Sequence, residues 1–249
     1  MALIDPYVPA PAVRNRLLGA LRPADLAVLW PKLEPVELPA REILQFPEQP
    51  MAAVYFIETG WLSMLATLED GDGAEVGLVG HEGMLGLPLL LDDDRDDLEG
   101  MVQCQGTALR LPVAAFREAL AHLPGLRPLL NRYALVHLGQ VARTAACNGR
   151  HDVSHRLARW LLMGHDRAQG DTYPMTHEFL AMMLGVRRAG VSTAAMMLQK
   201  AGLISYSAGW ITITDRPGLE NASCECYGVN RRATDRLFGP DGQGAPYRR

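Results

Sequence analysis

Cationic and hydroxyl-bearing side chains gather toward the C-terminal end of this 249-residue chain. Arg187 and Arg188 follow closely on Gly185, and Ser192 and Thr193 come about one helical turn later. A guanidinium group can donate two hydrogen bonds to guanine O6 and N7, and hydroxyl groups can bind phosphate oxygens. These residue types therefore suit nucleic-acid binding. The alternative for the arginine pair is a solvated helix start.

The apolar pattern around these arginines predicts the elements that position them. Gly185 separates two short apolar-periodic segments, at a place where a left-handed backbone is cheap only for glycine. Thr176 is a suitable N-cap for the first segment, and the second runs from Arg187 to about Lys200. A hairpin with Ala208-Gly209 at its turn follows. This order predicts a winged helix-turn-helix.

The charge distribution agrees with this interpretation. Residues 1–142 carry 10 basic and 19 acidic residues, whereas residues 143–249 carry 14 and 9. Only the second half can approach a phosphate backbone favourably. No apolar run reaches the roughly 18–20 residues of a membrane span, and the N-terminus lacks the features of an export signal. We expect a cytoplasmic protein without membrane contact.

The preceding residues predict three further parts. A helical segment over 12–33, broken near Pro23, leads into short strand-length runs between Val36 and Leu111 that suggest a β-roll. The acidic run 92–97 is expected to be a solvated loop. A long helix with apolar residues on more than one face follows Pro124, so it suits a dimer contact, with burial inside a monomer as the alternative.

We therefore predict an α+β protein with four parts: an N-terminal β-roll (double-stranded, jelly-roll-like) sensor domain, a long dimerisation helix, a C-terminal winged helix-turn-helix domain and a disordered tail. Their expected bounds are 12–123, 124–148, 152–238 and 239–249. The interruption at 147–152 is expected to be a hinge. The dimer contacts are expected from Leu130, Tyr133, Ala134, His137 and Val141.

This order of parts resembles the Crp/Fnr superfamily of bacterial transcription regulators. The resemblance is carried by the segment Tyr55–Leu62, the glycine-rich segment Gly80–Gly86 and the helix-turn-helix segment Thr176–Ile204. It implies a dimer that binds a palindromic site on double-stranded DNA. It places Arg188 at the position of a base-reading arginine. The full set of expected DNA contacts is Thr176, His177, Arg187, Arg188, Ser192, Thr193 and Lys200.

The resemblance also implies a ligand pocket near Gly83, Leu85, Gly86 and Leu87. The cyclic-AMP-binding members have a Glu after the last glycine and an Arg-Ser pair soon afterwards. Here Leu87 follows Gly86, and Asp96 and Asp97 stand where a cation would be needed. We therefore expect no cyclic AMP response, and the effector stays unidentified.

The remaining chemistry-bearing residues predict no metal, no cofactor and no catalysis. Cys224 and Cys226 could be half of a metal site, but no further ligand lies close in sequence, so a buried pair is expected, with redox sensing as an alternative. The first cysteine is Cys104, which excludes an Fnr-type N-terminal cluster. The methionines Met182, Met183, Met196 and Met197 are expected to pack in a core or an interface.

The competing function is a DNA-binding module without a small-molecule signal. In that version the roll is a scaffold, and its acidic stretch Glu69–Glu99 contacts a basic partner such as RNA polymerase. An enzyme has little support, because the adjacent His-acid pairs accompany no nucleophile motif.

Overall fold

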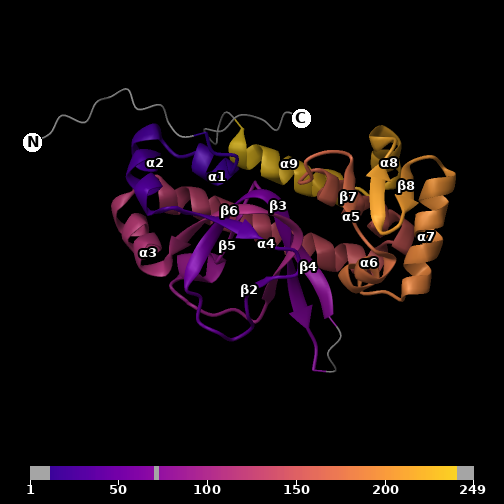
Figure 1. Cartoon of the computed structure of the whole chain (residues 1–249), viewed down its shortest axis with the longest axis horizontal. Helices are drawn as coiled ribbons and strands as arrows, with labels where there is room; N and C mark the ends of the chain where they lie inside the picture. Colours follow the sequence, from indigo (N-terminus) through magenta and orange to yellow (C-terminus); the bar gives the residue numbers. More distant parts are fainter. Residues whose placement is uncertain (1–11, 70–72, 240–249) are drawn as a thin grey trace, which may run out of the picture.

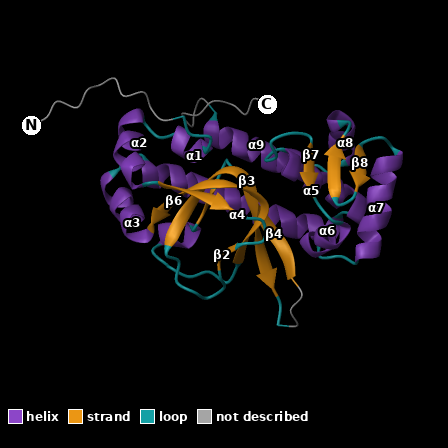
Figure 2. Cartoon of the chain, in the orientation of Figure 1, coloured by secondary structure: helices purple, strands orange, loops and turns teal. Residues whose placement is uncertain are grey.

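A computed structural model describes residues 12–69 and 73–239, so nearly all of the expected tail 239–249 lies outside the described residues. A strand-rich part and a smaller part made mainly of helices lie at opposite ends of the molecule, and a long helix runs behind the first toward the second (Figure 1, Figure 2). No helix in the described ranges combines the length and apolar character that a membrane crossing requires.

The N-terminal segment is helical and broken, as predicted. Asn15 caps its first helix by accepting hydrogen bonds from the backbone of Leu17 and Leu18, and Pro23 begins the second. The elements are α1 (Arg16–Gly19), α2 (Pro23–Leu29) and the 3-10 helix η1 (Trp30–Lys32).

Six antiparallel strands and one 3-10 helix form the β-roll. They are β1 (Glu34–Leu38), β2 (Ile43–Gln45), β3 (Ala53–Thr67), β4 (Gly73–Val79), β5 (Met84–Leu85), η2 (Leu87–Leu91) and β6 (Glu99–Pro112). The main order is β1-β6-β3-β4, with β2 on β6 and β5 on β3. The register of the long strand β3 against β6 shifts around Gly60. Gly60 has a φ of +70°, and a Cβ there would lie 2.3 Å from the Cys104 carbonyl oxygen.

Apolar side chains fill the interior of the roll. This cluster comprises Leu38, Ile57, Leu62, Met64, Val79, Leu85, Val102 and Ala108. A separate cluster joins the roll to α1, α2, α3 (Val113–His122) and the first half of α4 (Leu126–Arg150). The roll is therefore closed by helices at one side.

The long helix α4 continues through Gly149, where the sequence suggested a hinge. The chain turns only at His151, and the side chain of Asp152 then caps α5 (Val153–His165) by accepting a hydrogen bond from the His155 backbone N–H. The change of direction is thus confined to two residues.

The C-terminal part has the predicted winged-helix order. Its elements are β7 (Thr172–Pro174), α6 (His177–Leu184), α7 (Arg188–Lys200), β8 (Ile204–Ser207) and β9 (Trp210–Ile213), then α8 (Arg216–Ala222) and α9 (Cys226–Phe238). The small sheet has the order β7-β9-β8. α9 packs back along α4 (Figure 1). Its Leu237 and Phe238 enter the cluster that joins the roll to the helices.

Candidate nucleic-acid interface

The turn between α6 and α7 is fixed by local capping. Thr176 Oγ1 accepts a hydrogen bond from the Phe179 backbone N–H, and Gly185 ends α6 in the left-handed conformation with a φ of +59°. Behind the turn, Leu180, Leu184 and Val191 are buried in one cluster. The predicted helix-turn-helix is confirmed, and the packing presents the other face of α7 to solvent.

The N-terminal end of α7 carries the exposed cations that the sequence indicated. Arg187 and Arg188 are both exposed, as is Thr193 one turn later. Thr176 is exposed at the start of α6. Lys200 is also exposed, but it lies about 18 Å from Arg188 along the helix axis. Arg187 and Arg188 therefore lie at one end of α7 and Lys200 at the other, with Thr193 between them.

His177 and Ser192 have a different position from the one expected. His177 Nδ1 and Ser192 Oγ are 3.1 Å apart, and the His177 ring stacks on Tyr206 of β8 at a centroid distance of 4.2 Å. Burial and the nearby Arg188 guanidinium lower the pKa of His177, which favours the neutral ring. This pair joins α6, α7 and the hairpin of β8 and β9, which is the wing. His177, half-buried and with its neutral form favoured, is less available to a phosphate than an exposed cation would be.

Three of the four methionines are exposed, so core packing holds only for Met183, and packing of the others in an interface stays a prediction. Met183 is buried, whereas Met182, Met196 and Met197 are 40%, 61% and 56% exposed. Met196 lies one turn beyond Thr193 on the outer side of α7, away from the buried Val191 and Leu198. The three-residue spacing of Met196 from Thr193 indicated this outward position in the sequence, and the prediction overlooked it.

The wing adds polar and aromatic surface beside α7. Ala208 and Gly209 form its turn, both with positive φ, as a two-residue hairpin requires. Ser205, Ser207 and Trp210 are exposed, with Trp210 at 51%. The wing therefore presents hydroxyl groups and one indole beside α6 and α7, where Tyr206 contacts His177 and Gln199.

Two of the five expected dimer residues lie inside the chain's own core, and Ala134, His137 and Val141 are half-buried. Leu130 and Tyr133 are buried, and the Tyr133 hydroxyl donates to the Met84 carbonyl oxygen at 3.3 Å. Burial lowers the pKa of His137 to about 4. Exposed leucine, alanine and glycine residues of α4 follow a different line: Leu135, Leu138, Gly139, Ala142, Ala145, Ala146 and Gly149. Leu135 and Leu138 are 70% and 63% exposed.

The expected ligand residues are packed tightly. Gly83, Leu85 and Gly86 are buried, and Leu87 is half-buried at the start of η2. A Cβ on Gly83 would overlap the Tyr133 hydroxyl, and one on Gly86 would lie 2.8 Å from Val54. A solvent-open pocket lies elsewhere, where the roll, α4 and α9 meet. Its lining includes His81, Glu82, Tyr133, His137, Gln140, Arg167, Asn230, Arg231 and Thr234.

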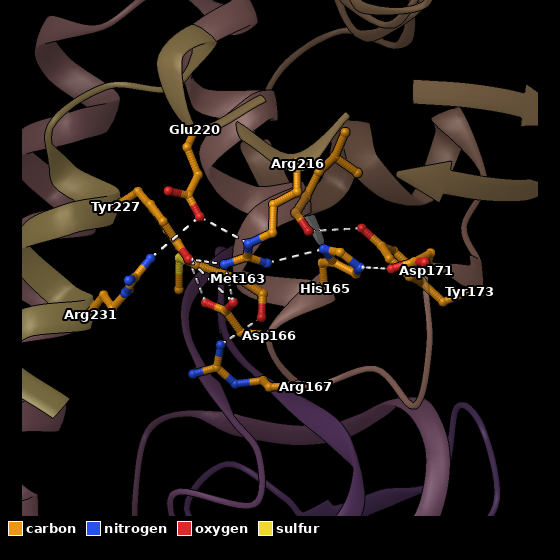
Figure 3. Close-up of polar contacts among 11 residues, drawn as sticks. Met163, His165, Asp166, Arg167, Asp171, Tyr173, Arg216, Glu220, Tyr227 and Arg231 are labelled. Atoms are coloured by element: carbon orange, nitrogen blue, oxygen red, sulfur yellow. Dashed lines mark hydrogen bonds and ion pairs between the residues drawn. The ribbon is translucent and has the colours of Figure 1, made fainter. Parts of the chain in front are cut away.

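A polar network surrounds the C-terminal end of α5, beside this pocket (Figure 3). Arg216 of α8 pairs with Asp166 and Glu220 and also contacts His165 Nδ1 at 3.1 Å. His165 Nε2 is 2.7 Å from Asp171 Oδ1. Arg167 pairs with Glu82 of the roll. The network thus links α5 and α8 to each other and, through Arg167, to the roll.

The cysteines of the C-terminal segment do not form an isolated pair. Cys224 and Cys226 are buried as predicted, and they share one cluster with Cys147 of α4. His151 lies at the same place, 3.7 Å from Cys226 Sγ through its Nδ1. Sequence proximity gave no sign of this arrangement.

Two family models match the chain, in the order that the fold suggests. Residues 35–122 match the cyclic nucleotide-binding domain, and residues 155–222 match the Crp-like helix-turn-helix domain. A search of curated proteins found no match.

Solved structures with the same fold include three bacterial regulators. FixK2 from Bradyrhizobium japonicum is 18% identical, with a TM-score of 0.67 over 77% of this chain and 98% of its own. A CRP-family transcriptional regulator from Thermus thermophilus is 20% identical, with a TM-score of 0.63 over 76% and 96%. The c-di-GMP responsive global regulator CLP from Xanthomonas campestris is 18% identical, with a TM-score of 0.58 over 77% and 99%.

Proposed function

This chain belongs to the Crp/Fnr superfamily of transcription regulators, and from that premise we propose that it reads a two-fold-symmetric DNA site as a homodimer. The observation that carries the proposal is the exposed end of α7, where Arg187 and Arg188 stand free of the buried face of the motif. The regulators of this family are not enzymes, so the function lies in DNA binding and its control.

The N-terminal end of α7 would enter the major groove, because recognition helices read base edges with their first residues. Arg188 would donate two hydrogen bonds to guanine O6 and N7. Thr193 and Met196, farther along the same exposed side, would add contacts, including apolar contact with a thymine methyl group. Thr176 and the wing serines would bind phosphate oxygens. His177 and Ser192 would act by holding α6, α7 and the wing in register.

The Arg188→Ala variant tests this assignment. Loss of a bidentate arginine is expected to cost about 1–3 kcal/mol of specific binding and to relax the preference at one base position in each half-site. Selection from random DNA identifies the site, and fluorescence anisotropy at fixed salt measures affinity. Arg117→Ala, an exposed arginine on α3, is the control and should bind as the wild type does. Unchanged affinity and base preference in Arg188→Ala would remove α7 from base recognition.

The exposed line on α4 supports the dimer. Leu135, Leu138, Ala142, Ala145 and Gly149 recur at three- and four-residue intervals, which is the spacing of a coiled-coil seam. The small residues in the second half would let two helices approach closely. A parallel pair would place two α7 helices on successive major grooves, about 34–36 Å apart.

The roll is proposed to be a sensor that does not respond to cyclic AMP. Its interior is occupied by eight buried apolar residues, and a phosphate buried among them would lack a cationic partner. The pocket between the roll, α4 and α9 is the place where an effector would contact the roll, the long helix and the C-terminal part together. Calorimetric titration with cyclic AMP is expected to give no saturable heat. Tight binding would contradict the proposal, and effector-independent DNA binding at full strength would favour a scaffold role for the roll.

A further inference from the structure

Four potential metal ligands meet where the long helix ends. Cys147 lies in the last turn of α4 and His151 directly follows that helix, whereas Cys224 and Cys226 lie at the junction of α8 and α9. Their three sulfur atoms and one ring nitrogen all lie within 4.8 Å of one another. The three cysteines are buried and the histidine is half-buried. The fold thus joins two segments that are more than 70 residues apart in sequence.

The separations suit ligands of one ion rather than a disulfide. Cys147 Sγ and Cys224 Sγ are 3.5 Å apart, and Cys226 Sγ is 3.7 Å from His151 Nδ1. A disulfide would require about 2.05 Å. Two thiolates bound to one tetrahedral zinc ion at about 2.3 Å each are separated by about 3.8 Å. An iron–sulfur cluster would put several iron atoms between the ligands and would need wider spacing.

The surroundings orient the histidine. His151 Nε2 lies 3.3 Å from Glu225 Oε2, on the side of the ring opposite to the nitrogen that faces Cys226. Metal-bound histidines commonly donate their second N–H to a carboxylate, which fixes the tautomer and strengthens the ligand. Glu225 sits between the two cysteines in sequence, so one short segment provides two ligands and this orienting carboxylate.

The charge of the surroundings also suits thiolate ligands. Three thiolates, a neutral imidazole and Zn²⁺ carry a net charge of −1. Arg156 and Arg159 are buried beside the cluster, where they interact electrostatically with the Cys147 thiol. Arg159 Nη2 donates to Thr144 Oγ1, one turn before Cys147, at 2.7 Å. Within the described residues, the Nε atoms of both arginines are buried without a hydrogen-bond partner. A buried anionic site would compensate these cations.

We propose that Cys147, His151, Cys224 and Cys226 bind one Zn²⁺ ion in a closed tetrahedral site. Four protein ligands leave no open coordination position, so the role is structural rather than catalytic. The ion would fix the end of α4 to the start of α9, next to the two-residue turn that leads into α5. The sequence-based expectation of a buried cysteine pair without metal considered only ligands near in sequence. The fold provides the other two.

Metal analysis of the purified full-length chain tests the proposal. The chain is prepared under reducing conditions, and zinc and iron are quantified by inductively coupled plasma mass spectrometry. We expect about one zinc per chain. Cys226→Ser and His151→Ala should lose most of it. Cys104→Ser, at a cysteine in β6, and His155→Ala, at an exposed histidine near the site, are matched controls and should keep it.

Cobalt substitution provides a readout on the wild-type chain and does not depend on any variant folding. Exchange of Co²⁺ into the site should give thiolate-to-cobalt charge-transfer absorption and the intense ligand-field bands of tetrahedral geometry, and added Zn²⁺ should abolish both. Chelation should lower the unfolding temperature. A chain that contains no zinc and gives no such spectrum with Co²⁺ would overturn the proposal, and iron at stoichiometric level would overturn the choice of metal.

Discussion

Glu75 is a carboxyl group buried between the roll and α5, and it is 5% exposed. It accepts hydrogen bonds from Ser63 Oγ at 2.5 Å and from Trp160 Nε1 at 2.8 Å. Burial raises its pKa to about 7, against the action of these bonds and of Arg159 and Arg167. Since the folded pKa lies above the unfolded one, the stabilisation is complete at acidic pH and is lost as pH rises through about 7.

Glu75→Gln should therefore flatten the pH dependence of stability. The wild type is expected to lose about 3 kcal/mol of folding free energy at Glu75 between acidic pH and a pH above 7. The amide keeps an acceptor for Trp160 without a charge. Denaturant unfolding at a series of pH values measures the difference between the two chains. His137 has the opposite effect in both chains, because its lowered pKa disfavours folding as pH falls below about 6.5. Subtracting the unfolding free energy of one chain from that of the other at each pH cancels this effect. Glu69→Gln, at an exposed site, should match the wild type.

At the scale of elements, two glycines of the helix-turn-helix have opposite roles. Gly185 has a φ of +59° at the end of α6, and a Cβ there would touch Ala74 of β4 at 3.4 Å. Gly190 lies within α7, where a Cβ would meet nothing within 4 Å. The first glycine is required by the turn, and the second only weakens a helix.

Gly185→Ala and Gly190→Ala should thus shift stability in opposite directions. The first is expected to destabilise by about 1–2 kcal/mol because alanine disfavours the left-handed conformation. The second is expected to stabilise by about 0.5–1 kcal/mol because alanine is the better helix former. Urea unfolding of both variants provides the comparison. A neutral Gly185→Ala would mean that the turn relaxes into another conformation.

The long helix has one face in the chain's own core and one face without a partner in the described chain. Leu138→Glu places a charge on the exposed face. If α4 pairs with a second copy, this change should convert the dimer to a monomer and weaken DNA binding at least tenfold, a loss of about 1.4 kcal/mol or more. Sedimentation equilibrium measures the mass. Leu91→Glu, at a leucine 69% exposed in η2, is the control and should stay dimeric. A dimeric Leu138→Glu would move the interface elsewhere.

At the scale of the whole molecule, the roll and the winged helix share a core. Trp61 and Leu78 of the roll are buried in the same cluster as Trp160 and Tyr173, and the Trp61 and Tyr173 rings meet edge to face at 5.6 Å. Arg167 and Glu82 add an ion pair whose side chains are 10% and 12% exposed. Relative motion of the two parts would have to break this packing, so their coupling is strong in the conformation seen.

Arg167→Met should weaken this coupling, because it leaves the buried Glu82 carboxylate without its main cation. Removing one member of a buried pair typically costs about 3–5 kcal/mol. The double variant Arg167→Met, Glu82→Gln should recover much of that loss. Calorimetric unfolding of the wild type, the two single variants and the double variant gives the interaction energy between the two side chains. Additive losses would show that the two side chains act independently.

The sequence alone determined the winged helix-turn-helix, because caps and turns depend on neighbouring residues: Thr176, Gly185 and Ala208-Gly209 have the conformations that their types predict. It also indicated the roll and the long helix through apolar periodicity. Only the tertiary structure decided which apolar face of α4 is free, because apolar residues lie on more than one face and the roll covers one of them. The tertiary structure also determines that apolar side chains fill the roll interior and that Met196 is exposed. It places Cys147 and His151 beside Cys224 and Cys226. These features depend on contacts between segments far apart in sequence, which no local pattern specifies.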